Sequence, residues 1–404
     1  MSEARRYDIC IVGGGLVGLA TARALQEAFD GVSILILEKE NRVAAHQSSH
    51  NSGVVHSGLY YPPGSLKAQL CVEGRHAIKD LCLKSGIRFN ESGKLVVASR
   101  ASEIGSLDEL ERRGKANGLQ GMRRLRGSEI AEVEPAATGL EALHIHETGV
   151  ADFEGVANHL AAALVESGAS IVTDAEVSEI VHHVGGVDVH TGIGQFSSRI
   201  LVNCAGLHSD RVAEMAGLSP EVQVIPFRGE YYRLTDNAAV LVKSLIYPVP
   251  DPRYPFLGVH FTRRYDGSVE VGPNALLALG REHYRGSGVD WTELRSIMAY
   301  PGFRKLAFDN WRSGTSELVN SKSKRLYARL AQRLVPELRS QDLLVGGSGV
   351  RAQAVDRSGQ LVDDFVIEVA GSTVHVLNAP SPAATASIAI GRHIGRKVRP
   401  MLEN

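Results

Sequence analysis

The chain has 404 residues, with 44 Lys and Arg against 45 Asp and Glu, which gives a formal charge of −1 when histidine is neutral. Apolar residues make up 44% and charged residues 22%, so the composition excludes a disordered, collagen-like or coiled-coil protein. The balanced charge argues against nucleic acid as a partner, because binding it requires an excess of Lys and Arg. At about 100–200 residues per domain, the length favours two domains.

The four cysteines, Cys10, Cys71, Cys82 and Cys204, form neither a CxxC pair nor a metal-ligand pattern. Cys10 and Cys204 lie in apolar runs, where we expect buried thiols in a reducing compartment. No signal peptide precedes the first predicted strand, and no run of about 18 apolar residues is present. We therefore expect a cytoplasmic protein with no membrane span and no metal site.

The first predicted elements form a βαβ unit. Residues 7–12 are an apolar, β-branched run typical of a buried parallel strand, and residues 16–29 carry apolar side chains at helical spacing. Residues 34–37 form a second buried strand, which ends at Glu38.

Later segments show two patterns. Further helices are predicted at 67–84, 101–117, 152–167 and 383–394, and further buried strands at 170–173, 200–203, 343–345 and 374–377. Between 224 and 273, extended segments with aromatic residues and prolines predict a largely antiparallel sheet. Segments of nucleotide-binding type therefore occur at the start, middle and end of the chain.

This order predicts an α/β fold (α+β overall) in which one domain interrupts another. A Rossmann-like dinucleotide-binding domain is expected from residues 1–90, 150–223 and 340–404. An inserted substrate domain, built mainly on an antiparallel sheet, is expected from residues 91–149 and 224–339.

Gly13-x-Gly15-x-x-Gly18 follows a predicted strand and opens a predicted helix. In such a loop the glycines permit a tight turn, close approach of a pyrophosphate and close packing of helix on strand, and the helix N-terminus faces the anion. Glu38 lies 20 residues after Gly18, where a carboxylate binds the ribose hydroxyls and disfavours NADP. The loop predicts NAD or FAD.

The segment 48–61 (SSHNSGVVHSGLYY) resembles the flavin-contacting segment of the D-amino-acid-oxidase-like (DAO) family of FAD-dependent oxidoreductases. Further stretches are similar to the L-2-hydroxyglutarate dehydrogenase/oxidase branch of that family: 225–232 (IPFRGEYY), 246–252 (IYPVPDP), 255–262 (PFLGVHFT), 271–275 (VGPNA) and 378–385 (NAPSPAAT). The resemblance extends from about residue 5 to residue 395.

The resemblance implies FAD as cofactor and a 2-hydroxy dicarboxylate as substrate, with L-2-hydroxyglutarate converted to 2-oxoglutarate by hydride transfer to flavin N5. It implies a membrane quinone or oxygen as the electron acceptor. The alternative donors are an amino acid, a sarcosine-like amine or glycerol 3-phosphate. A flavin-binding module without catalysis is disfavoured by the neutral charge and the lack of a redox cysteine pair.

The resemblance also implies which residues bind the cofactor. Ser48, Ser49 and Asn51 are expected beside the pyrophosphate and ribityl chain, and Val177 and Gly206 at the adenine and near the flavin nucleotide. Five residues lie where a loop enters the last helix, whose N-terminus would stabilise negative charge on the reduced flavin: Gly349, Ser381, Pro382, Ala383 and Thr385. With these, the expected cofactor contacts are Gly13, Gly15, Gly18, Glu38 and His56.

Two histidines are candidates for catalysis. His56 lies in the flavin segment between Gly53 and Gly58, and we consider three roles for it: general base, flavin contact without chemistry, or covalent flavin attachment. His260 lies in a stretch similar to the hydroxyglutarate branch, where it is expected to bind substrate or to act as the base, unless it is an ordinary core histidine.

A dicarboxylate substrate requires cations, and arginine binds a carboxylate with two parallel hydrogen bonds. Arg351, beside the expected flavin loop, is the first candidate, both for binding and for catalysis, and Arg228 is the second. Tyr247 would add a hydroxyl donor. Three other arginines, Arg263, Arg264 and Arg281, are equally explained by surface ion pairs.

Residues 301–333 are basic, with eight Lys and Arg against Asp309 and Glu317. Four apolar side chains are interleaved with the first of them: Phe303, Leu306, Phe308 and Trp311. Such a segment would dock peripherally on the inner face of an anionic membrane and bring the reduced flavin near a quinone. The alternative is a solvated helical face whose aromatic side chains pack inward.

Overall fold

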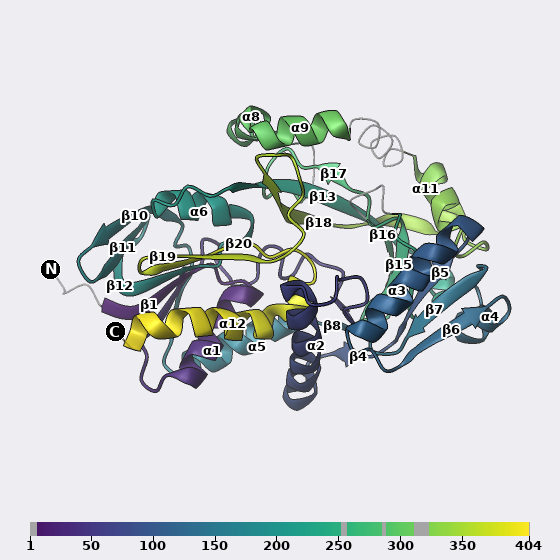
Figure 1. Ribbon diagram of the computed structural model, residues 1–404, viewed down its shortest axis with the longest axis horizontal. Helices are drawn as coiled ribbons and strands as arrows, with labels where there is room; N and C mark the ends of the chain where they lie inside the picture. The colour runs from purple at the N-terminus through teal and green to yellow at the C-terminus, as the bar shows by residue number, and fades with distance from the viewer. Residues whose placement is uncertain (1–5, 252–256, 285–287, 311–322, 404) are drawn as a thin grey trace.

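The computed structural model describes residues 6–251, 257–284, 288–310 and 323–403. Two large sheets lie side by side, one toward the chain termini and one at the opposite end of the molecule (Figure 1). Within the described residues, no helix combines the length and the apolar character needed to cross a membrane.

The first sheet has eight strands in the order β10-β11-β12-β1-β2-β9, with β20 beside β12 and β19 beside β20. The β1–β12, β1–β2, β2–β9 and β12–β20 pairs are parallel. The strands are β1 (Arg6–Val12), β2 (Ile34–Leu37), β9 (Ser170–Val172), β10 (Val177–His183), β11 (Gly186–Thr191), β12 (Gly194–Asn203), β19 (Val366–Ala370) and β20 (Thr373–Asn378).

Four helices cover one face of this sheet: α1 (Leu16–Ala28), α2 (Leu66–Ser85), α5 (Phe153–Glu166) and α12 (Ala383–Glu403) (Figure 1). On the opposite face, side chains of β1, β2 and β12 form a core cluster with α6 (Ser209–Met215) and with residues of β10 and β11. Because both faces are covered, the central strands are apolar throughout, as their sequence predicted.

Local chemistry sets the ends of these helices. The Ser65 hydroxyl accepts a hydrogen bond from the Ala68 amide at the start of α2, and Gly86 ends α2 in the left-handed region with φ 67°. A Cβ atom at Gly391 of α12 would stand 2.5 Å from the Ala20 backbone of α1. The glycine therefore lets α12 lie close against α1, beside the first βαβ unit.

The second sheet has nine strands in the order β17-β13-β16-β15-β14-β5-β7-β6, with β18 beside β13. Its pairs are antiparallel except β14–β5. The strands are β5 (Lys94–Ala98), β6 (Met122–Arg126), β7 (Glu141–Ile145), β13 (Val222–Leu234), β14 (Leu245–Pro248), β15 (His260–Arg263), β16 (Val269–Gly272), β17 (Leu276–Leu277) and β18 (Leu343–Asp356).

A small third sheet has the order β3-β8-β4, formed by β3 (Val54–Val55), β8 (Gly149–Ala151) and β4 (Phe89–Asn90). Among the described residues, the remaining helices are η1 (Ala101–Glu103), α3 (Ile104–Ala116), α4 (Glu129–Val133), η2 (Gly206–His208), α7 (Asp236–Ala239), α8 (Trp291–Ala299), α9 (Pro301–Asp309), α11 (Lys324–Ala331) and η3 (Ser340–Asp342). The α8–α9 pair stands at the outer edge of the molecule, above β13, β17 and β18 (Figure 1).

The predicted mixed α/β fold is confirmed, and three local predictions need correction. The predicted strand at 343–345 continues to Asp356, because β18 pairs with β13 from Leu343 to Asp356. Val345 is exposed rather than buried. The last helix continues from the predicted end at 394 to Glu403. Arg281 forms a buried ion pair with Asp210 instead of a surface pair. The division into a discontinuous dinucleotide-binding domain and an inserted domain stays a prediction.

Candidate functional site

A cavity of about 490 Å³ is lined by residues of both large sheets. This volume lies in the range of cofactor sites, about 300–1,000 Å³. The lining brings together the glycine loop after β1, the segment around His56, the residues after β12, part of β18 and the start of α12. Segments far apart in the chain thus meet at one site.

Most of the predicted cofactor residues lie in the cavity wall: Gly13, Gly15, Glu38, Ser48, Asn51, His56, Val177, Gly206, Gly349, Ser381, Pro382, Ala383 and Thr385. Gly18 and Ser49 do not line it. A Cβ atom on Gly18 would collide with the Gly13 carbonyl oxygen, so Gly18 lets helix and loop pack closely, as its place in the motif predicted.

The glycine loop is held by its neighbours in a turned conformation. Gly13 has φ 108° and donates its amide to the Leu37 carbonyl at 2.8 Å. The Gly14 amide donates to Oε2 of Glu38 at 2.8 Å, and the Leu16 amide donates to Oγ of Ser48 at 2.9 Å. Glu38 therefore orders the loop as well as standing in the cavity wall.

The polar side chains of the flavin-like segment also stabilise their own loop. Asn51 donates to the carbonyls of Gln47 and Ser48 at 3.0 and 2.8 Å and accepts from the Gly53 amide at 2.8 Å. These bonds fix the conformation of the loop that carries the cavity-lining residues. The sequence had predicted only a direct contact between Asn51 and the cofactor.

The start of α12 is tied to the same segment. The Thr385 hydroxyl donates to the Val54 carbonyl at 3.2 Å and accepts from the His56 amide at 3.1 Å. Two helix N-termini, those of α1 and α12, open onto the cavity through Gly15 and Ala383. Such termini stabilise negative charge, which a dinucleotide carries on its pyrophosphate.

The residues present fit a bound FAD. A Cβ atom at Gly13 would stand 2.5 Å from the Cys204 carbonyl oxygen, and one at Gly349 would stand 2.6 Å from the His50 carbonyl oxygen. Larger side chains are therefore excluded at two places in the wall, which leaves backbone next to the cavity.

His56 lines the cavity and is held as a neutral imidazole. Burial, then the charges of Lys94, His260 and Arg351, lower the pKa of His56 well below its usual value. Its Nδ1 atom is inaccessible and has no hydrogen-bond partner in the described part of the chain, and Nε2 lies 3.5 Å from the Ser381 hydroxyl. A neutral imidazole is the form that accepts a proton.

His260 and Tyr247 are stacked on neighbouring strands, with ring centroids 4.0 Å apart. The Nδ1 atom of His260 donates to the Gly258 carbonyl at 2.8 Å, so Nε2 carries the lone pair. Burial lowers the pKa of His260 to about 3. Neither residue is in the cavity wall described above, although the charge of Arg351 acts to lower the pKa of both.

Sequence reasoning missed Lys94, the first residue of β5. Its side chain is 1% exposed, and Nζ lies 4.4 Å from the centre of the Tyr60 ring and 4.2 Å from that of Tyr247. Burial lowers the pKa of Lys94 to about 7. The sequence carried one signal, which is that a lysine heads the otherwise apolar run Lys94–Ala98.

The two candidate arginines occupy different positions. On the β13–β18 ribbon, Arg351 pairs with Phe227 and Arg228 pairs with Val350, so their side chains leave opposite faces. Arg351 lines the cavity, and its positive charge acts to lower the pKa values of His56 and Tyr231. Arg228 pairs with Glu230 at 2.9 Å and is not part of the cavity wall.

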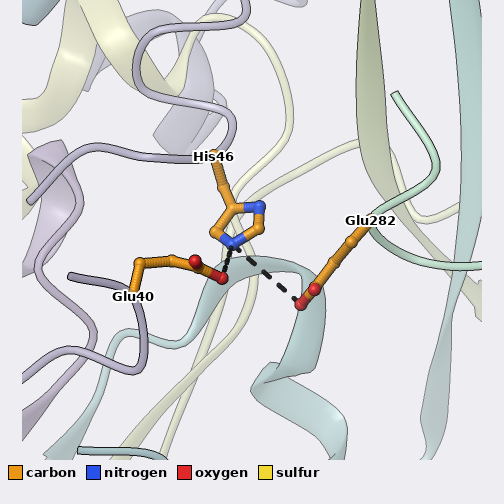
Figure 2. Close-up of side chains that lie close together, drawn as sticks. All are labelled: Glu40, His46 and Glu282. Carbon is orange, nitrogen blue, oxygen red and sulfur yellow. Dashed lines mark hydrogen bonds and ion pairs between the residues drawn. The ribbon is translucent and has the colours of Figure 1, made fainter. Parts of the chain in front are cut away.

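A charged cluster closes another part of the wall. Figure 2 shows the Nε2 atom of His46 pointing toward the carboxylates of Glu40, at 2.9 Å, and Glu282, at 4.0 Å. Lys39 lies 2.7 Å from Oε1 of Glu40 and 2.5 Å from Oε1 of Glu282, and His208 lies 2.6 Å from the same Glu282 oxygen.

These potential metal-ligand atoms of Glu40, His46 and Glu282 lie within 4.8 Å of one another. However, the Lys39 ammonium already supplies a cation to both carboxylates. Hydrogen bonding to His208, with Lys39, lowers the pKa of Glu282 to about 2. We interpret the cluster as an ion-pair network that joins Glu282 to the cavity wall.

Comparisons with known proteins support FAD as the cofactor. The model of the family described as FAD dependent oxidoreductase (DAO) matches residues 8–396. A protein named L-2-hydroxyglutarate dehydrogenase from Indibacter alkaliphilus is 46% identical over 95% of this chain and 97% of its own length.

Proteins of the same name show similar identity in distant organisms. The Escherichia coli K12 protein is 43% identical over 98% of this chain and 94% of its own, and the human mitochondrial protein is 42% identical over 98% and 89%. Among solved structures, the FAD-bound L-alpha-glycerophosphate oxidase of Mycoplasma pneumoniae has a TM-score of 0.80 and 24% identity, covering 99% of this chain and 95% of that one. This last likeness bears on the fold alone.

Proposed function

Because the chain belongs to the family of FAD-dependent oxidoreductases, we propose that it oxidises L-2-hydroxyglutarate to 2-oxoglutarate. The observation that carries the proposal is that Arg351 lines the same cavity as His56. Lys67 also lines it, paired with Asp363, and the charges of Lys94, Arg351 and Lys67 all lower the pKa of His56. A dianionic hydroxy acid would be attracted to this region more strongly than a zwitterionic amino acid, whose net charge is near zero. The relatives at 42–46% identity support the same substrate.

FAD, when bound, supplies the hydride acceptor at flavin N5. We propose that the Gly13–Gly15 turn and the α1 N-terminus hold the pyrophosphate, and that Glu38 holds the ribose. Val177 would contact the adenine, and the N-terminus of α12 would stabilise negative charge at the flavin end. Their presence in one cavity wall supports this assignment.

In the proposed reaction, Arg351 binds the carboxylate next to the hydroxyl group and orients the substrate. His56 accepts the hydroxyl proton, because its lowered pKa keeps the imidazole neutral at physiological pH. His260 and Tyr247 bind the substrate as a stacked pair. Arg228 stays the second candidate for a carboxylate, although its ion pair with Glu230 makes it less suited than Arg351.

We further propose that a membrane quinone or oxygen takes the electrons onward and that the protein docks peripherally on an anionic membrane. Exposed apolar side chains gather on α8 and α9, where Trp291 is 74% and Phe308 79% exposed. Arg304 and Lys305 lie on α9 between the apolar positions. Phe303 packs inward, as the alternative interpretation of a solvated helical face with inward-packed aromatic side chains predicted. The predicted contributions of Trp311, Arg312, Glu317 and Lys322 lie outside the described residues.

The membrane proposal is tested by flotation with vesicles that contain anionic lipid, at low and at high salt. We expect flotation at low salt that is lost at high salt. Replacing both Trp291 and Phe308 with serine should weaken the flotation seen at low salt. A wild-type protein that stays in the lower fraction at low salt would contradict the proposal.

The substrate proposal is tested anaerobically with the purified yellow protein. Each candidate donor is mixed with it, and bleaching of the flavin absorption band is followed. L-2-hydroxyglutarate should bleach the flavin fastest. Persistent colour with this donor, together with bleaching by an amino acid, a sarcosine-like amine or glycerol 3-phosphate, would overturn the choice of substrate.

A further inference from the structure

Lys94 is buried between two aromatic rings in the second sheet. It begins β5, where its backbone pairs with Leu245 on one side and Ile145 on the other. The side chain is 1% exposed, and Nζ faces the rings of Tyr60 and Tyr247 at 4.4 and 4.2 Å. The ammonium group has therefore been removed from water.

Within the part of the chain that the structure describes, no carboxylate compensates this charge. No hydrogen bond or ion pair of Lys94 accompanies its two ring contacts. Cys71 is the one acidic group whose charge raises the pKa of Lys94, and burial raises the pKa of that thiol to about 12, so it is neutral. Buried charges in proteins normally have a partner, since leaving one unpaired costs several kcal/mol.

Other polar atoms near Lys94 also lack a partner. The Tyr60 hydroxyl and Nδ1 of His56 are inaccessible and make no hydrogen bond in the described ranges. The positive charges of Lys94 and Arg351 both lower the pKa values of His56 and His260. The two cations therefore surround one pair of histidines, and a neutral histidine does not compensate their charge.

We propose that Lys94 binds the second carboxylate of the substrate and so makes the enzyme select 2-hydroxy dicarboxylates over 2-hydroxy monocarboxylates. This inference rests on the proposed function, in which Arg351 binds the carboxylate beside the hydroxyl group. Lys94 and Tyr60 do not line the cavity themselves, so the proposal requires the far end of the substrate to extend past the cavity wall toward them. The substrate then supplies the missing anion, and the Tyr60 hydroxyl is available as a second donor to it.

The pH dependence of the wild-type enzyme provides a test without a variant. The groups around Lys94 do not titrate near neutrality, because the pKa values of Tyr60, Cys71 and Tyr247 are raised and those of His56 and His260 are lowered. Lys94, with its pKa lowered to about 7, is charged below that pH and neutral above it. We expect kcat/KM for L-2-hydroxyglutarate to fall as pH rises through 7, and kcat/KM for L-2-hydroxyvalerate to show no such fall.

The decisive experiment compares Lys94→Met, Lys94→Arg and the matched control Lys79→Met, whose lysine pairs with Glu91 on the surface of α2. L-2-hydroxyvalerate has the length of L-2-hydroxyglutarate but ends in a methyl group. In Lys94→Met, kcat/KM for the dicarboxylate should fall about 10–150-fold, the worth of a hydrogen bond to a charged group, while that for the monocarboxylate stays level. Lys94→Arg should retain part of the discrimination, and Lys79→Met all of it.

A binding measurement separates this proposal from the proposed function. Glutarate, which has no hydroxyl group to oxidise, should perturb the flavin spectrum of the wild type and of Lys79→Met, but not that of Lys94→Met. If glutarate behaves so and L-2-hydroxyglutarate does not reduce the flavin, the proposed substrate fails and the dicarboxylate site stands.

Three results would overturn the role of Lys94. An equal loss for both hydroxy acids in Lys94→Met would mean that the lysine acts in the chemistry or the fold. Unchanged discrimination would mean that another group binds the second carboxylate. If Lys94→Met is purified without FAD, the comparison passes to Lys94→Arg and to the wild-type pH profiles, where identical profiles for the two acids would overturn it.

Discussion

His260 stacks on Tyr247 while its Nδ1 atom donates to the Gly258 carbonyl, so only Nε2 is able to accept a proton. His56 differs, because its Nδ1 atom makes no hydrogen bond to any described residue and its ring stands in the cavity wall. Both imidazoles are neutral at physiological pH. The difference in position leads us to assign the base to His56 and substrate binding to His260.

The first prediction concerns these two histidines. His56→Asn should slow anaerobic flavin reduction about 10²–10⁴-fold, the usual contribution of a general base, without loss of FAD. His260→Asn should act mainly on KM. The exposed His159, which contacts Ser85, gives a matched control, His159→Asn, with unchanged kinetics. A larger loss of rate in His260→Asn than in His56→Asn would reverse the assignment.

The second prediction concerns attachment of the flavin. If His56 is the base, FAD is held without a covalent bond, and acid precipitation should leave the yellow colour in the supernatant. A yellow pellet that becomes colourless in His56→Asn would instead identify His56 as the point of attachment.

The third prediction is that Arg351→Lys weakens reduction by substrate while FAD stays bound. A lysine retains the charge but loses the two parallel hydrogen bonds that a guanidinium donates to a carboxylate. We expect kcat/KM to fall by about 10–150-fold, the range for hydrogen bonds to charged groups. Arg392→Lys, which alters a surface pair with Glu73, serves as the control. Loss of FAD from Arg351→Lys would mean that the arginine supports the fold of the site.

The fourth prediction is that Glu282→Gln loosens FAD. Glu282 links its loop to Lys39 and His208 in the cavity wall (Figure 2). The side chain is 35% exposed, so each broken pair should cost only about 0.2–1 kcal/mol. A few-fold increase in the FAD dissociation constant, measured by fluorescence recovery, is expected.

The pH dependence of this contribution follows from the lowered pKa of Glu282. The stabilisation is complete above the usual glutamate pKa of 4.5 and is lost only as pH falls toward about 2. Retention of FAD at pH 5 and pH 7 should therefore differ between wild type and Glu282→Gln by the same factor. A difference that disappears at pH 5 would show that another group controls retention.

The fifth prediction concerns Gly18. Its Cβ would collide with the backbone of Gly13, which cannot move without displacing the loop. Gly18→Ala should lower the free energy of unfolding by at least about 1–3 kcal/mol, as overpacking does, and should reduce FAD content. Gly105, in α3, has open space around its Cβ position, so Gly105→Ala should leave stability equal or slightly raised. Equal thermal midpoints for the two variants would contradict the packing argument.

Sequence reasoning was most successful where chemistry is local. Gly13 and Gly15 precede α1, Gly18 lies in its first turn, and Glu38 follows the next strand, so the strand–loop–helix pattern around them has the predicted form. The family and its cofactor, expected from the resemblance, are confirmed by the family model over residues 8–396.

The sequence was least informative where distant segments create an environment. Lys94 is buried because β5 pairs with β14 and because Tyr60 arrives from another part of the chain. Arg281 meets Asp210 and Glu293 in the interior, a pairing that no short-range pattern indicates. Val345 is apolar yet exposed, since an apolar run does not reveal which strand edge or face it occupies.

The cavity wall contains Gly13 near one end of the chain and Thr385 near the other, and β12 joins β1 and β20 in one sheet. Every residue from Gly13 to Thr385 must therefore be synthesised before the cavity wall is complete.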